Sequence, residues 1–239
     1  MLYAKGVYLY YLSLKKLGFK FLKEFFFSTS FYNKLLKSNI PKRFFFYPNP
    51  YLLSPLLNHK SFLFKISNED IEFFWENNSK NSEEKSIHSF LWLNLIDRKN
   101  ESKIIQKLIE EWITKYGNYT KNVWDENLTS KRIISWISNA EIISDNTEKE
   151  FQEVFFSSLI KQINFIKKNF KSILYETSKI ASISAIILSG LVFKEYYNNY
   201  NFGLKELKKI ISTFFDKNGF PKNRNSENLI IFLQYFILI

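Results

Sequence analysis

Residues 102–116 read SKIIQKLIEEWITKY, and this stretch decides the fold class. A stripe of apolar side chains with the 3.6-residue period predicts an amphipathic helix from about Ser102 to Tyr116. The same period continues to the end of the chain, so the sequence predicts an all-α fold. The stripe consists of Ile104, Ile105, Leu108, Ile109, Trp112 and Ile113.

Downstream of this stretch, capping signals and the helical period predict further helices. Thr147, followed three residues later by Glu150, is a capping-box pattern in front of an apolar series over 151–170. The connections at 198–202 and 216–225 are short and polar, which predicts antiparallel helical hairpins. The other helices are predicted from Ser178 to about Tyr197, over 204–215 behind Gly203, and from Ser226 to the last residue.

The first 60 residues have a different composition, rich in aromatic residues and lysine. Their spacing predicts an amphipathic helix pair over 2–37, broken near Ser28–Ser30. Prolines at 41, 48, 50 and 55 predict an extended linker, and the alternation at 62–66 and 71–75 predicts short strands. The predicted organisation is therefore an N-terminal segment over 1–60 and a helical domain over 61–239.

The last predicted helix ends in an apolar run without a cap or a basic last turn. We therefore expect that the helical domain over 61–239 is truncated at its C-terminal end. A missing continuation would cover the apolar face of this helix.

Composition limits the possible chemistry. The formal net charge of +11 points to acidic partners. The chain has no Cys, and His59 and His88 are its two histidines, so neither a metal site nor a cofactor is predicted. The lysines are scattered and no nucleic-acid-binding module is recognised, so nucleic acid is not an expected partner.

No membrane span and no leader peptide are predicted. The most apolar later stretch, 180–193, is shorter than the ~20 residues that a spanning helix needs. The apolar stretch 7–14 is rich in Tyr and lacks a small-residue cleavage site. These features predict a cytoplasmic location by default.

Four stretches, in this order, carry a family resemblance. Together they make the chain, over roughly 62–239, resemble the N-terminal helical portion of bacterial heparinase II/III-like polysaccharide lyases. The resemblance implies a partial (α/α) toroid, which the family follows with a C-terminal β-sandwich that this chain lacks, and it is compatible with a periplasmic location. The stretches are IHSFLWL at 87–93, WDENLTSKRIISW at 124–136, SGLVF at 189–193 and NGFPKNRNS at 218–226.

The family's known members cleave glycans that contain uronic acid by β-elimination, so the resemblance implies an acidic polysaccharide as partner. By alignment, Thr177 and Ser178 stand where the family has an Asn-His pair that neutralises the uronate, and Pro221 stands where it has a His. Thr offers no amide donors, and Pro has no side-chain proton. We therefore expect this chain to be inactive as a lyase.

Five residues are candidates for contacting the glycan, and each has a structural alternative. Arg132, supported by Asn127, could bind a uronate or sulfate through its guanidinium, or it could tie down a helix end or Asp125. Trp136 could stack on a sugar or fill the core. His88, spaced four residues from Trp92, could line a cleft or belong to a helix edge, and Arg224 could attract an anion at a helix N-terminus or serve the turn.

A second class of function also fits the composition. A basic, non-catalytic binding or scaffold protein could lie on an anionic membrane or polymer surface through its aromatic, lysine-rich first segment.

Overall fold

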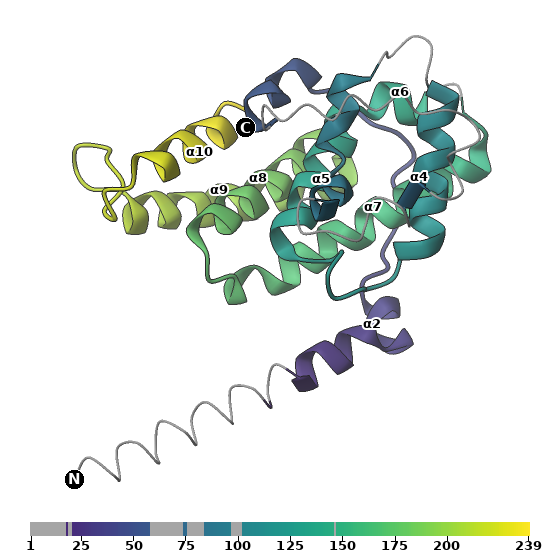
Figure 1. The fold of residues 1–239 in the computed structure, drawn as a ribbon, viewed down its shortest axis with the longest axis horizontal. Helices are drawn as coiled ribbons and strands as arrows, with labels where there is room; N and C mark the ends of the chain where they lie inside the picture. The colour runs from purple at the N-terminus through teal and green to yellow at the C-terminus, as the bar shows by residue number, and fades with distance from the viewer. Residues whose placement is uncertain (1–17, 19–20, 58–73, 76–83, 97–101, 146) are drawn as a thin grey trace.

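The computed structural model describes residues 18, 21–57, 74–75, 84–96, 102–145 and 147–239 (Figure 1). In these ranges the chain forms α-helices and 3-10 turns, with one isolated β-bridge between Phe215 and Pro221 and no strand. The prediction of an all-α fold is confirmed. The strand predicted at 62–66 lies outside the described residues, as do His59 and residues 2–17 of the predicted helix pair. Of the second predicted strand, at 71–75, the structure describes residues 74 and 75, and both are helical.

The labelled helices follow one another along most of the chain. The α-helices are α2 (Ser30–Leu35), α4 (Ser102–Tyr116), α5 (Glu126–Ser138), α6 (Ala140–Ser144), α7 (Lys149–Asn169), α8 (Glu176–Val192), α9 (Tyr197–Phe214) and α10 (Ser226–Phe236). The 3-10 turns are η1 (Pro50–Leu56), η2 (Glu84–Ser89), η3 (Leu91–Leu95), η4 (Phe170–Ser172) and η5 (Lys194–Tyr196). No helix in these described ranges is both long and apolar enough to cross a membrane.

Helix α4 has the bounds that its apolar stripe predicts, and Ile105, Leu108, Ile109 and Trp112 are buried. Helix α10 also begins as predicted. The Asn225 side chain accepts hydrogen bonds from the first backbone N–H groups of this helix, which would otherwise be unsatisfied.

Two helix starts differ from the prediction. Helix α7 begins at Lys149, and Thr147 does not cap it, because its hydroxyl donates to the backbone oxygen of Ser144 instead. Helix α5 begins at Glu126, within the stretch WDENLTSKRIISW, whereas Thr129 or Ser130 was the expected first residue of the helix that carries Arg132. The Asp125 carboxylate is its N-cap and accepts from the backbone N–H groups of residues 127 and 128.

The helix predicted from Ser178 to Tyr197 is interrupted. Helix α8 ends at Val192, and Phe193 adopts an extended conformation with φ −120° and ψ 116°. The Phe193 ring is fully buried and stacks on Phe44 at 4.8 Å, so packing holds the chain out of the helix at this point. The predicted loop 198–202 is part of α9, and Gly203 lies inside that helix because α8 passes close to it.

The stretch over 87–93 is also not one helix. Phe90 has φ 58°, a left-handed conformation that ends η2 and starts η3, and its ring is fully buried between Trp75 and Trp136. His88 and Trp92 therefore do not share an α-helical face, and that prediction is wrong. Packing of the Phe90 ring offsets the conformational cost of this backbone.

Helix α8 lies at the centre of the packing. It contacts α5, α9 and α10, most extensively α9. Helix α4 packs on α6 and α7, α7 also contacts α5 and α8, and Lys167 of α7 donates a hydrogen bond to Asn199 of α9. Turns η1, η2 and η3 cover α5, so both α5 and α8 are buried along most of their length. Figure 1 shows α8 and α9 running side by side, with α4 and α6 at the opposite end from the α9–α10 turn.

The described part of the N-terminal segment packs onto this helical body. Residues 21–28 are helical, and the break predicted near Ser28–Ser30 is found at Thr29, whose hydroxyl accepts from the backbone N–H of Tyr32 at the start of α2. Beyond α2 the chain has little regular structure up to η1. Even so, Leu36, Phe44 and Leu53 are buried in the same core as the helices.

Helix α10 buries Phe232 and Tyr235 but exposes Ile230, Leu233 and Ile237. An uncovered apolar face on this helix is what its sequence predicts.

Candidate functional site

Arg132 lies in the centre of α5 and is completely buried. Its Nε donates to Gln162 Oε1 at 2.6 Å and its Nη2 to Thr129 Oγ1 at 3.1 Å. Its Nη1 donates to the backbone oxygens of His88 at 2.8 Å and Val123 at 3.2 Å. Among the described residues, the guanidinium therefore donates to neutral acceptors on α7, on η2 and on the loop before α5. These hydrogen bonds hold α5 against the three other elements.

Trp112 and His88 complete this group, which we call the Arg132 cluster: Arg132, His88, Trp112, Thr129 and Gln162. The guanidinium carbon lies 4.2 Å from the centre of the Trp112 ring, a cation–π arrangement. Trp112 Nε1 donates to His88 Nδ1 at 3.1 Å, so His88 is an acceptor here and its ring is neutral. Burial, and then the charge of Arg132, lower the pKa of His88 to about 4.

The cluster shows which interpretation applies to three of the predicted site residues. The prediction that Arg132 faces a cleft is wrong, since the side chain has no exposed surface and ties structural elements together. His88 is 3% exposed and is held within the cluster. Trp136 is fully buried between Phe90, Trp112 and Phe155, as expected for a core aromatic rather than a sugar platform.

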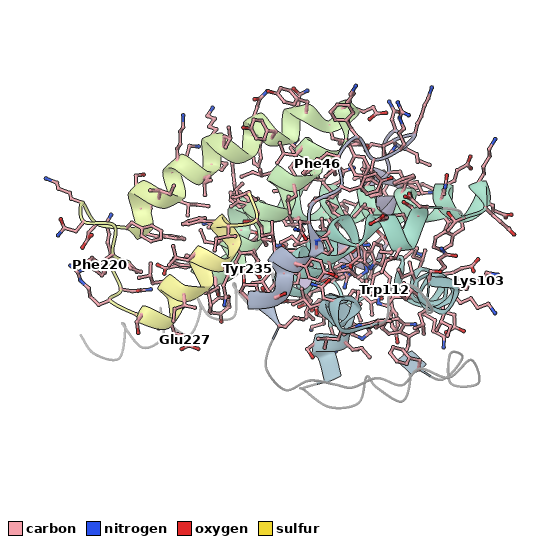
Figure 2. All side chains as sticks on the ribbon, turned by 90° about the horizontal axis from the view of Figure 1, so that it is seen from above. Phe46, Lys103, Trp112, Phe220, Glu227 and Tyr235 are labelled. Carbon is pink, nitrogen blue, oxygen red and sulfur yellow. The ribbon has the colours of Figure 1, made fainter. Side chains whose placement is uncertain are left out.

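The other two predicted residues lie apart from the Arg132 cluster. Asn127 is half-buried in the first turn of α5 and is not among the groups that Arg132 binds. Arg224 is exposed in the α9–α10 turn with φ 57°, and its Nη1 lies 2.8 Å from Asp216 Oδ2. Figure 2 shows Phe220 of this turn at one end of the molecule and Trp112 apart from it within the helical body, so the five residues do not form one site.

The positions at which the resemblance implies replaced catalytic groups lie on different elements, a helix and a turn. Thr177 and Ser178 are half-buried in the first turn of α8. Pro221 is buried in the α9–α10 turn, where it pairs with Phe215. Neither position carries the Asn or His that the family's chemistry uses there.

We expect His88 to make the stability of the fold depend on pH. Above pH 6.5 its ring is neutral in both states. Between pH 6.5 and about 4 the unfolded chain binds a proton that the folded chain does not. The free energy of unfolding should therefore fall by about 3 kcal/mol as the pH is lowered through this range. Urea titrations from about pH 7 to about pH 4.5 measure this loss, and the His88→Gln variant should lose less. If the free energy of unfolding of His88→Gln fell as much with pH as that of the wild type, His88 would not be the cause of the pH dependence.

A surface pocket of about 380 Å³ lies between the C-terminal end of α4 and the first half of α7. Its distinctive feature is a pair of lysines, Lys37 and Lys161, whose positive charges repel each other. We call it the Lys37–Lys161 pocket. It is lined by Lys37, Ile113, Gly117, Asn118, Glu153, Val154, Ser157, Ser158 and Lys161.

Lys161 is 8% exposed and is held at the end of α4. Its ammonium group donates to the backbone oxygen of Gly117 and to Asn118 Oδ1, both at 2.6 Å. A cation at this position interacts favourably with the negative end of the α4 dipole. Burial, and then Lys37, lower the pKa of Lys161 to about 8.

The pocket can bind an anionic group. An ammonium has three N–H donors and Lys161 uses two on Gly117 and Asn118, which leaves one for a ligand. A bound anion would relieve the repulsion between the two lysines. Glu153 opposes anions, but it can accept hydrogen bonds from hydroxyl groups, and Val154 offers apolar surface.

Sequence reasoning missed this pocket because Lys161 lies in an ordinary amphipathic helix. Its neighbours Ile160 and Ile163 follow the apolar series, and a lysine between them is usually a solvated residue. One signal was available in the sequence. Lys161 falls on the same half of α7 as Phe155, Ser158 and Gln162, all of which are buried, so a lysine at this position is not an ordinary solvated residue.

No metal-binding group of three or more His, Cys, Asp or Glu side chains occurs among the described residues. Comparison of the chain with protein-family models, with curated proteins and with solved structures returns no match. The functional interpretation therefore rests on the residues and geometry of the Lys37–Lys161 pocket and on the motifs of the sequence.

Proposed function

We propose that this chain is a non-catalytic helical domain related to heparinase II/III-like proteins, which binds acidic polysaccharide through the Lys37–Lys161 pocket. The observation that carries the proposal is the pair of like charges in one pocket, with Lys161 held in place by α4. Two positive charges next to low-dielectric walls attract anions, and Glu153 offsets only one of them.

The remaining groups of the pocket suit a sugar better than a simple inorganic ion. Lys37 and Lys161 would hold a carboxylate or sulfate, while Ser157 and Glu153 would exchange hydrogen bonds with neighbouring hydroxyls. Val154, 40% exposed, would contact the apolar face of a sugar ring.

Contacts between helices that are not consecutive in the chain also support the relationship to a toroid. In an (α/α) toroid successive helices alternate between an inner and an outer ring, so helices that are not consecutive in the chain become neighbours. The contacts of α8 with α5 and α10, and the contact of α4 with α7, have this character. We propose that α5, α8 and α10 correspond to the inner helices.

The proposal predicts that Lys37→Gln weakens binding of a short heparin oligosaccharide about tenfold, because a charge-assisted hydrogen bond is worth about 1.5 to 3 kcal/mol. Lys37 is the better position to change, since Lys161 also stabilises the end of α4. Calorimetric titration at near-physiological salt measures the dissociation constant.

The matched control is Lys103→Gln, which removes one exposed lysine near the start of α4; Figure 2 shows Lys103 at the periphery. This change should alter the affinity less than twofold, because a single screened charge contributes little. Equal losses for both variants would mean that attraction is diffuse and would overturn the pocket assignment. A lyase assay tests the statement that the chain is non-catalytic. If the chain produced more unsaturated-uronate absorbance from an acidic polysaccharide than a heat-inactivated sample, that statement would be wrong.

A further inference from the structure

Large apolar side chains gather on the exposed side of residues 21–35. The most exposed are Phe21 at 70%, Phe25 at 64% and Leu22 at 62%. We call this set the aromatic surface: Phe21, Leu22, Phe25, Phe26, Phe31 and Leu35. An exposed apolar patch of this kind marks a contact surface on a folded protein.

The aromatic surface is continuous across the break at Thr29. The ring of Phe26, before the break, lies 6.4 Å from the ring of Phe31, after it. Within each part the exposed residues are spaced as on one helix face, with Phe21 and Phe25 four apart and Phe31 and Leu35 four apart.

The opposite side of the same segment is anchored in the core. Phe27 and Tyr32 are buried, their rings stack at 4.4 Å, and Phe27 also contacts Phe165 of α7. Glu24 forms an ion pair with Lys121 at 2.7 Å. The aromatic side chains are therefore presented to solvent by a fixed backbone.

Positive charge is concentrated in the part of the sequence that carries this surface. Residues 21–57 contain Lys23, Lys34, Lys37, Lys42 and Arg43 against a single acid, Glu24. Over residues 1–57 the sequence has nine Lys and Arg and one Glu, which accounts for +8 of the formal net charge of +11. The chain's excess charge thus lies mainly in the part of the sequence that exposes the aromatic residues.

We propose that the aromatic surface docks onto a bilayer that contains anionic phospholipid. Phe and Leu side chains on one face would enter the region between headgroups and acyl chains, while the flanking lysines would contact lipid phosphates and carboxylates. Charge complementarity selects this occupant, since a bilayer with anionic lipid offers an apolar layer and dense negative charge together. Figure 1 shows α2 at the edge of the helical body, away from α9 and α10, so these two helices would not obstruct the approach of a bilayer.

Vesicle flotation of the full chain tests the proposal. We expect the chain to bind vesicles of phosphatidylcholine that contain about 30 mol % phosphatidylserine. Binding to vesicles of phosphatidylcholine alone should be much weaker, and binding to the anionic vesicles should weaken as salt is raised. The double variant Phe21→Ser, Phe25→Ser should bind at least about tenfold more weakly, because each Phe side chain loses its transfer into the apolar layer.

The matched control is Ile230→Ser, Ile237→Ser, which removes two exposed apolar residues from α10 and should leave vesicle binding unchanged. Equal losses for the two double variants, or equal binding to both kinds of vesicle, would overturn the proposal. A third outcome would also overturn the proposal. If the chain does not bind vesicles but self-associates, and the double variant Phe21→Ser, Phe25→Ser abolishes this self-association, the aromatic surface binds a second copy of the chain.

Discussion

Replacing Arg132 by Met is expected to lower the free energy of unfolding by about 3 to 5 kcal/mol, the largest effect of any single change that we predict. The guanidinium makes four hydrogen bonds and a cation–π contact in the fully buried core of α5. A Met side chain has similar length but leaves the acceptors on Gln162, His88, Val123 and Thr129 without donors. Buried acceptors without partners are costly, because unfolding returns them to water.

The matched control is Arg224→Met, since Arg224 is exposed and makes an ion pair with Asp216. Exposed ion pairs contribute about 0 to 1 kcal/mol, so this variant should unfold within about 1 kcal/mol of the wild type. Guanidinium denaturation followed by circular dichroism measures both. If the two variants were equally stable, Arg132 would have to be accessible to solvent, and a ligand-binding role for it would return.

Gly190→Ala is expected to destabilise the fold by about 3 kcal/mol through overpacking. A methyl group at Gly190 would lie 2.2 Å from the backbone nitrogen of Tyr200 and 2.8 Å from its Cβ. These atoms belong to α9, so α8 and α9 would have to move apart along the contact that joins them.

Gly203→Ala is the informative comparison, because it lies on α9 at the same contact. Its methyl group would approach Ile187 Cγ1 to 2.3 Å, but this atom belongs to one side chain, so a local shift of Ile187 can relieve the contact without moving a helix backbone. We expect a loss of about 1 kcal/mol for this variant. Thermal unfolding of the two proteins gives the order of stability, and the reverse order would show that backbone contact at Gly190 does not limit the approach of the helices.

The sequence predicted those parts of the fold that depend on local signals. The stripe over 102–116 has the helical period over its whole length, and α4 has the predicted bounds. Asn225 is a local N-cap directly before Ser226, and α10 begins at Ser226 as predicted. The break at Thr29 was likewise visible in the Ser and Thr residues around it.

The errors occurred where packing at long range outweighs local preference. Phe193 leaves the helix to stack on Phe44, which lies about 150 positions earlier in the sequence. Phe90 adopts a left-handed conformation for the sake of its buried ring, although nothing in IHSFLWL marks a break. Gly203 resembled a helix start, but its role is to let α8 approach α9.

The candidate site could be predicted only in part for the same reason. A single Arg on a helix has the same local sequence whether it faces a cleft or a core, so the sequence leaves both interpretations of Arg132 open, and only the structure shows that it is buried. Its acceptors come from Val123, Gln162 and the backbone of His88, which only the tertiary structure brings together. The Lys37–Lys161 pocket joins residues that are far apart in the sequence, so no motif could show it.

The most direct test of our account is to map where an acidic oligosaccharide contacts the folded chain. Backbone amide chemical shifts, recorded while a short heparin oligosaccharide is titrated into the protein, report this residue by residue. We predict saturable shifts at Lys37, Gly117 and Asn118 and in the first half of α7, with unchanged shifts at Arg132 and in the α9–α10 turn. Shifts spread over exposed lysines such as Lys103, with none concentrated at the pocket, would contradict the proposal that the Lys37–Lys161 pocket is the binding site.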